Sequence, residues 1–404
     1  MGGDQLKKIL FKGDKVIWAV FFIICAISWV EVFSATSRQV VESGSYWMPI
    51  IKHTIFLVGG MVVVWFMHNM KVEWIKHMTH FIYWVGLIGL IWAQLDKGSQ
   101  INGSARWIKI MGLTIQPMEF AKMGMVMITA LITSEHQGDD GVDSKALKRI
   151  ILYCLPPVLL ILKENLSTAA IVLLTLYMMM FVGRFPKDQM LKIFGIAAAV
   201  VSIGLAAIMF TPDEAAGWGR FGEKIVTWKH RIADAVTSKP VTAEEYEITN
   251  EQRTHANIAI ASSHIFGRGP GNSEARNFIP HAYSDFIYAV IIEELGLAGG
   301  FIVLLLYMTI LYRCGKIARK CEDSYPAFLI MGVGMIITMQ AMLHMFITVG
   351  DFVTGQPLPL ISQGGTSVLI NCIYIGMVLS ISRYAKKCAM QAQSEATEAN
   401  GKNV

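Results

Sequence analysis

The chain passes from a long polar segment into a long apolar one within the stretch Phe278-Ile-Pro-His-Ala-Tyr-Ser-Asp-Phe-Ile-Tyr-Ala-Val-Ile-Ile-Glu-Glu-Leu-Gly296. The apolar segment continues to about Tyr312, which is long enough for a helix that crosses a bilayer. Ser284 and Asp285 stand at its start, and both residue types are favoured helix N-caps. Asp285 is therefore either a structural cap or a carboxylate held at the membrane surface for chemistry. The local sequence alone favours the cap.

The composition is that of a membrane protein. Hydrophobic residues make up 54% of the 404 residues and charged residues only 16%, whereas a soluble domain has about 25% charged residues. The net charge of +5 does not indicate nucleic-acid binding, because basic residues in a membrane protein mainly encode its topology. We therefore expect an all-α polytopic membrane protein that binds no nucleic acid.

Ten apolar segments are predicted to span the membrane as helices. They are residues 16–34, 49–67, 81–95, 118–134, 150–162, 167–182, 190–210, 286–312, 326–349 and 366–384. Pro156 and Pro157 are expected to kink or break the fifth of these helices. We expect a membrane domain over residues 16–384, preceded by a cytoplasmic segment, 1–15, and followed by a disordered cytoplasmic tail, 385–404.

Lys and Arg residues in the short connections predict the orientation of the chain. They are more frequent in the connections on the side of the N-terminus, as at Lys316, Arg319 and Lys320, than on the other side. Connections rich in Lys and Arg face the cytoplasm. Both termini are therefore predicted to be cytoplasmic, and the long connection over residues 211–285 is predicted to lie outside.

Other segments on the predicted outer side also carry polar groups that are unfavourable in a bilayer. Glu119 and Lys122 share one face of a helix because they are three residues apart, and they form either a functional pair or a pair that merely neutralises itself. The stretch 355–367 contains two prolines and paired glycines, and such irregular backbone is tolerated at membrane depth only inside protein or beside a water-filled cavity. With Asp285, these segments suggest a single cavity at the outer leaflet.

Four motifs resemble the SEDS family (shape, elongation, division and sporulation), polytopic peptidoglycan polymerases that include RodA and FtsW. They are Asn-Gly-x-x-Arg-Trp-Ile from Asn102, Gln-Pro-x-Glu-x-x-Lys from Gln116, Pro-x-Ala-x-x-Asp-Phe-Ile from Pro280 with Glu-Glu-Leu-Gly after it, and Leu-Pro-x-x-Ser-x-Gly-Gly-Thr-Ser from Leu358. Their order and spacing are similar to those of the family. The stretch Gly269-Pro-Gly-Asn-Ser273 resembles division members, such as FtsW, more than elongation members, such as RodA.

The resemblance implies a peptidoglycan glycosyltransferase that polymerises lipid II, an undecaprenyl-pyrophosphate-linked disaccharide-peptide, at the outer face of the bacterial cytoplasmic membrane, in septal wall synthesis. It implies that Asp285 is the catalytic residue, a general base. The implied substrate-binding residues are Arg106, Glu119, Lys122, His281, Ser362, Gln363 and Thr366. The implied partners are a class B penicillin-binding protein, which crosslinks the product, and other membrane proteins of the division complex.

Three positions depart from the family pattern. His281 stands where a glutamate is frequent, Asn165 where an aspartate is common, and Gln363 where a tyrosine is usual. The histidine weakens the case for a two-carboxylate metal site, although an assisting Mg²⁺ or Mn²⁺ stays open. Three alternatives stay open. A lipid II flippase would need a polar path on the inner side, and a non-catalytic scaffold of the division complex would tolerate loss of Asp285. The third is an elongation role like that of RodA.

Overall fold

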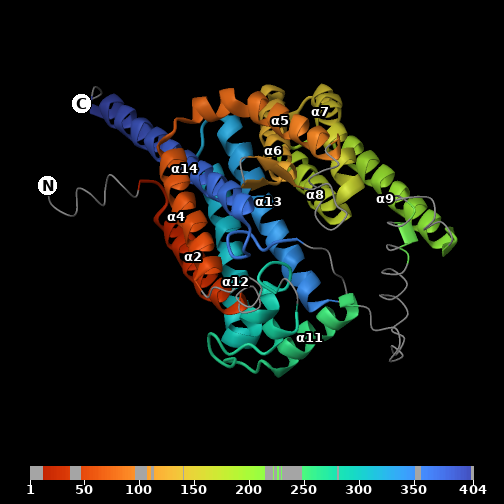
Figure 1. The fold of residues 1–404 in the computed structure, drawn as a ribbon. Coiled ribbons are helices and arrows are strands. Elements are labelled where there is room, and N and C mark those ends of the chain that lie inside the picture. Colours follow the sequence, from red (N-terminus) through yellow and green to blue (C-terminus); the bar gives the residue numbers. More distant parts are fainter. Residues whose placement is uncertain are drawn as a thin grey trace, which may run out of the picture.

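Long helices pack side by side into a bundle, with one helix, α9, along its edge (Figure 1). This computed structural model describes residues 12–36, 47–95, 107–110, 113–139, 141–213, 222, 225–226, 229, 248–279, 282–350 and 356–401. Within these ranges, seven helices are long and apolar enough to cross a membrane. The predicted class, an all-α polytopic membrane protein, is confirmed.

A helix stands at each of the ten predicted spans. They are α2 (Lys15–Ala35), α4 (Met48–Asn69), α5 (Val72–Leu95), α6 (Pro117–Glu135), α7 (Ser144–Glu164), α8 (Leu166–Val182), α9 (Lys187–Phe210), α12 (Ile287–Ala318), α13 (Ser324–Val349) and α14 (Gly365–Gly401). Three of them, α6, α7 and α8, are not among the seven that meet the length and composition of a span. Almost every residue of α6 is nevertheless buried in the bundle.

The connections contain short elements that the sequence did not predict. Strands β1 (Ile108–Ile110) and β2 (Leu113–Ile115) form one antiparallel hairpin, and β3 (Gln137–Gly138) and β4 (Gly141–Val142) form another. Helix α11 (Ile248–Ser262) and the short 3₁₀ helix η2 (Ala275–Asn277) lie in the long connection before α12. Strands of two or three residues are too short to show an alternating apolar pattern.

The two adjacent prolines do not break α7, which runs through Pro156 and Pro157. Pro157 lacks the N–H that would bond to the carbonyl oxygen of Tyr153, four residues earlier. The hydroxyl of Tyr83 on α5 donates to that same oxygen at 2.8 Å. The break expected from the prolines is therefore wrong, because a neighbouring helix supplies the missing donor.

Two predicted boundaries are also wrong. Residues 385–401 were expected in a disordered tail, but they continue α14. This segment is rich in Ala, Gln and Glu, which are strong helix formers, so its polarity did not prevent a helix. Helix α5 begins at Val72 and not at residue 81. The prediction was too short because it followed the apolar residues only, and the first turns of this helix carry polar residues.

Helices α5 and α6 approach each other very closely. A Cβ atom at Gly86 would lie 2.6 Å from the Cα of Ala121, and one at Gly124 would lie 2.7 Å from the Cα of Tyr83. Small residues allow this kind of backbone contact between membrane helices. The contact fixes the position of α6, which carries Glu119.

Helix α12 is interrupted at Gly296, whose φ of 77° and ψ of 178° are not helical. This backbone region is open essentially to glycine alone. The segment 264–269 lies across the interruption. The N–H groups of Arg268 and Gly269 donate to the carbonyl oxygens of Glu293 and Glu294 at 3.0 and 2.8 Å.

The other side of the interruption is satisfied in the same way. In a regular helix, the N–H groups of Leu297 and Ala298 would donate to the carbonyls four residues earlier. Here they donate instead to the carbonyl oxygens of His264 and Ile265, each at 3.1 Å. The two helical hydrogen bonds from Leu297 and Ala298 to Glu293 and Glu294 are thus replaced by four bonds to one crossing segment, so these four groups all have partners.

We predict that Gly296→Ala destabilises the protein by roughly 3 kcal/mol or more, because the backbone conformation excludes other residues. In addition, the new Cβ would lie 2.1 Å from the carbonyl oxygen of Ile265. Gly195→Ala on α9 is the control, since nothing lies within 4 Å of its Cβ position and alanine favours a helix. Thermal unfolding in detergent measures both variants. Equal stability of the two variants would contradict the tight crossing.

Candidate active site

Asp285 lies two residues before the first residue of α12 and is half-buried. The hydroxyl of Ser284 donates to its Oδ1 atom at 2.9 Å. The N-cap of α12 is Phe286, which makes no side-chain cap hydrogen bond. The cap position predicted for Ser284 or Asp285 is therefore wrong, and the interpretation of Asp285 as the N-cap loses its basis.

The segment 356–363 packs against the backbone next to Asp285. The N–H of Gln363 donates to the carbonyl oxygen of Tyr283 at 3.0 Å. The hydroxyl of Ser362 donates to the carbonyl oxygen of Ser284 at 2.8 Å. Ser362 is buried, and its oxygen also accepts from the N–H of Leu358 at 2.7 Å. Ser362, predicted as a substrate contact, thus holds two backbone segments together.

The carboxylate of Glu119 and the ammonium group of Lys122 form a buried ion pair. Their Oε1 and Nζ atoms are 2.8 Å apart, and the side chains are 3% and 1% exposed. The same Nζ donates to Oε1 of Gln340 on α13 at 2.8 Å, and Nε2 of Gln340 donates to the carbonyl oxygen of Pro357 at 3.1 Å. The pairing predicted from the spacing is confirmed, and it supports the segment 356–363.

The start of this segment, at Gln356, is held by hydrogen bonds to α8 and α13. The side chain of Asn165 caps α8 by accepting from the N–H of Thr168 at 3.1 Å. The hydroxyl of Thr168 accepts from the side chain of Gln356, and Nδ1 of His344 on α13 donates to the carbonyl oxygen of Gln356 at 2.6 Å. Asn165 therefore acts here through its oxygen, as an aspartate at this position also could.

Two side-chain oxygens near this segment have unused capacity to accept hydrogen bonds. Oε1 of Gln363 and Oγ1 of Thr366 are buried, and neither has a hydrogen-bond partner among the described residues. A buried polar atom without a partner is unfavourable by about 1–3 kcal/mol, so such atoms mark places that water or a ligand completes. Both residues were predicted as substrate contacts, and both can accept a hydrogen bond from a bound molecule.

Two predicted site residues, Arg106 and His281, lie outside the described residues. Two cavities formed by the described residues do not coincide with the predicted outer cavity. These have volumes of about 250 and 380 Å³, and they are lined at the other ends of the helices by residues such as Lys316 and Tyr325. Asp285 lines neither of them. Two of the segments predicted to surround that cavity, 282–285 and 356–363, are joined by hydrogen bonds, and the outer cavity itself stays a prediction.

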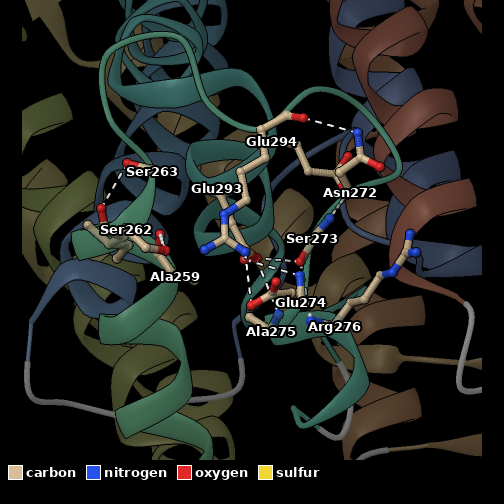
Figure 2. Close-up of polar contacts among 12 residues, drawn as sticks. Ala259, Ser262, Ser263, Asn272, Ser273, Glu274, Ala275, Arg276, Glu293 and Glu294 are labelled. Atoms are coloured by element: carbon tan, nitrogen blue, oxygen red, sulfur yellow. Dashed lines mark hydrogen bonds and ion pairs between the residues drawn. The ribbon is translucent and has the colours of Figure 1, made fainter.

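Glu293 and Glu294 have a structural role that their sequence pattern did not predict. Both carboxylates are buried, and they bind the segment 271–275, which leads into η2 (Figure 2). Glu294 accepts from the N–H groups of Gly271 at 2.8 Å and of Ser273 at 3.1 Å. Hydrogen bonds to a charged acceptor are stronger than those between neutral groups.

Glu293 makes the same type of contact with the next two residues of the segment. Its carboxylate accepts from the N–H groups of Glu274 and Ala275 at 3.1 and 3.3 Å. Nη1 of Arg268 lies 3.5 Å from its Oε1 atom. Adjacent carboxylates in an apolar helix indicate a function by themselves, and a glycine-rich turn upstream offers N–H groups that can bind them. These two signals together could have revealed the contact.

The end of α2 joins this cluster. The hydroxyl of Ser34 donates to Glu294, and a guanidinium nitrogen of Arg276 donates to the Ser34 hydroxyl oxygen at 2.8 Å. The same nitrogen donates to the carbonyl oxygen of Ser34 at 3.2 Å. The long connection is thus fixed to two helices, α2 and α12.

Comparisons with known proteins agree with this architecture. A family model described as "Cell cycle protein" (FTSW_RODA_SPOVE) matches residues 14–387. A protein of Coxiella burnetii named "Probable peptidoglycan glycosyltransferase FtsW" is 25% identical over 386 residues, which cover 92% of this chain and 98% of the relative.

Two solved structures share the fold. One, described as "Structural coordination of polymerization and crosslinking by a peptidoglycan synthase complex", has a TM-score of 0.72 and 22% identity, with 92% of this chain and 98% of that chain covered. The rod shape determining protein RodA of Thermus thermophilus has a TM-score of 0.62 and 20% identity, with 92% and 97% covered.

We predict strong coupling between Glu119 and Lys122. Glu119→Gln or Lys122→Met alone leaves one buried charge without its counter-charge, and each should destabilise the protein by roughly 3–5 kcal/mol. The double variant removes both charges and should be destabilised by much less than the sum of the two. A double-mutant cycle on thermal unfolding measures the coupling. Simple additivity would show that the two charges do not stabilise each other.

Proposed function

Because the chain belongs to the FtsW/RodA/SpoVE family of cell cycle proteins, which its match over residues 14–387 shows, we propose that it is a peptidoglycan glycosyltransferase of the division type. The protein is a multi-pass membrane protein. The relative from Coxiella burnetii supports the activity and the division role, since it carries the name FtsW and aligns with 92% of this chain.

The proposed substrate is lipid II, in which a disaccharide-peptide is linked to a polyprenyl chain through pyrophosphate. A hydroxyl oxygen of the acceptor sugar attacks the anomeric carbon of the donor sugar. A new C–O bond forms while the bond from that carbon to pyrophosphate breaks, and the lipid pyrophosphate leaves with the electron pair. The hydroxyl proton passes to a general base, a transfer that accelerates such reactions by about 10²–10⁴-fold.

The position of Asp285 carries this proposal. Asp285 is half-buried just before α12, at the point where the long connection ends and this helix begins. The adjoining backbone is held at Tyr283 and Ser284 by the segment 356–363. A base must lie within hydrogen-bond reach of the proton that it accepts, so a fixed backbone next to Asp285 favours this role.

In this proposal, some of the other site residues contact the substrate and others support the segment 356–363. Gln363 and Thr366 offer buried oxygen acceptors, which suit the hydroxyl groups of a sugar. Lys122 is buried against Glu119 and Gln340, and we propose that it supports the segment 356–363 and does not contact the pyrophosphate. Stabilisation of the leaving pyrophosphate is assigned to Arg106, because a guanidinium group binds phosphate oxygens in a bidentate manner.

The sequence left open an assisting Mg²⁺ or Mn²⁺. Over the part of the chain that the structure describes, no three His, Cys, Asp or Glu side chains lie together as a metal site requires. Mg²⁺ commonly uses only one or two protein carboxylates together with substrate phosphates, so an assisting cation stays a proposal, and each step above is assigned to residues of this chain. The proposed partner is a class B penicillin-binding protein that crosslinks the new strands, and the proposed location is the division septum of the cytoplasmic membrane.

We predict that Asp285→Asn lowers the rate of lipid II polymerisation by about 10²–10⁴-fold, with normal expression and thermal stability. The amide has nearly the same shape as the carboxylate but cannot accept the proton. Asp188→Asn, at the exposed start of α9, changes the charge equally and should keep the rate. Glycan synthesis from purified lipid II, with the partner transpeptidase present, measures both variants. Polymerisation by Asp285→Asn at the rate of the unmodified protein would show that Asp285 is not the base, whereas no polymerisation by the unmodified protein would favour a scaffold over an enzyme.

A further inference from the structure

A cavity of about 250 Å³ lies at the end of the bundle opposite Asp285. It is formed where α2 begins and α12 ends, beside the middle of α14. Its charged lining residues are Asp14, Lys15, Arg313, Lys316, Lys320 and Lys386. Five of these are basic and one is acidic, so the cavity has an excess of positive charge. The function proposed above does not use it.

One of the five basic groups is already neutralised inside the protein. Nε of Arg313 donates to Oδ2 of Asp14 at 3.1 Å. Burial by itself raises the pKa of Asp14, but hydrogen bonds from Arg313 and from the backbone of Ile17 and Val16 outweigh it and hold the pKa below its usual value. Asp14 therefore stays ionised at neutral pH and cancels the charge of Arg313. The net charge of the cavity comes from its lysines.

The lysines line the rim of the cavity and are exposed. Within the described ranges, Lys15, Lys316 and Lys320 have no ion-pair partner. Lys316 lies on the last turn of α12, and Lys320 lies two residues beyond the end of that helix. Lys386 approaches from α14 and donates to the carbonyl oxygen of Gly13. Ammonium groups from three helices thus surround one small space.

The surroundings of the cavity are those of a membrane surface. Val16, which lines it, is 39% exposed, and Tyr312, just before its α12 residues, is 63% exposed. These side chains belong to helices that are long and apolar enough to cross the bilayer. The positive charge therefore lies where exposed apolar helix surface ends, which is the level of lipid phosphates.

We propose that this cavity binds the phosphate group of an anionic phospholipid in the leaflet on the side of the chain termini, which the sequence predicts to be cytoplasmic. Basic pockets between membrane helices on this side are suited to anionic head groups. The acyl chains would lie against the exposed apolar surfaces of α2 and α12. A soluble phosphate would gain the same ionic contacts but would not use these surfaces.

The test compares Lys316→Gln/Lys320→Gln with Lys145→Gln/Lys148→Gln. The second pair is also exposed and lies at the start of α7, so it removes the same charge away from the cavity. Purified proteins in a zwitterionic detergent are titrated with phosphatidylglycerol, phosphatidylcholine or inorganic phosphate, and the unfolding temperature is measured, because a ligand of the folded state raises it.

The unmodified protein and the α7 variant should be stabilised by phosphatidylglycerol and not by the other two. Each basic residue near an anionic surface contributes about fivefold in affinity, so the cavity variant should bind phosphatidylglycerol about 30-fold more weakly. If the double variant does not fold, Lys320→Gln alone should show about a fivefold effect. An equal response of the cavity and α7 variants, or equal stabilisation by inorganic phosphate, would overturn the proposal.

Discussion

Backbone N–H and C=O groups inside a membrane protein must find partners within the protein, because lipid supplies none. At Gly296 a spanning helix breaks, and the donors and acceptors of the broken turn would be left without partners in an isolated helix. The segment 264–269 supplies all four hydrogen bonds. Helix α12 can therefore be interrupted only while this segment is in place, and the connection before α12 becomes part of the helix packing.

The position of the candidate site follows from this crossing. Glu293 and Glu294, on the turn just before the break, bind N–H groups of the segment 271–275, and Ser34 joins α2 to the same cluster. Asp285 lies about two turns before these glutamates on the same stretch of chain. The segment 356–363 holds the other side of its backbone. Asp285 is thus held between two irregular segments, each of which makes hydrogen bonds to helices.

The sequence predicted what depends on local pattern. Apolar length placed the ten helices, the spacing of Glu119 and Lys122 predicted their pairing, and the motifs directed attention to Asp285. It could not predict features that depend on a distant partner. The residues around Gly296 read as continuous apolar helix, because the crossing segment lies about 30 residues upstream in the sequence. The unbroken helix at Pro157 likewise depends on a hydroxyl from α5.

The measurement that tests this account most directly is hydrogen–deuterium exchange at the amides of Arg268, Gly269, Leu297 and Ala298. If the crossing segment completes the broken turn, these four amides should exchange as slowly as the helical amides of α12 on either side. Glu294→Gln should accelerate exchange in the segment 268–275. Exchange of the four amides at the rate of an open loop, while the rest of α12 stays protected, would contradict the account.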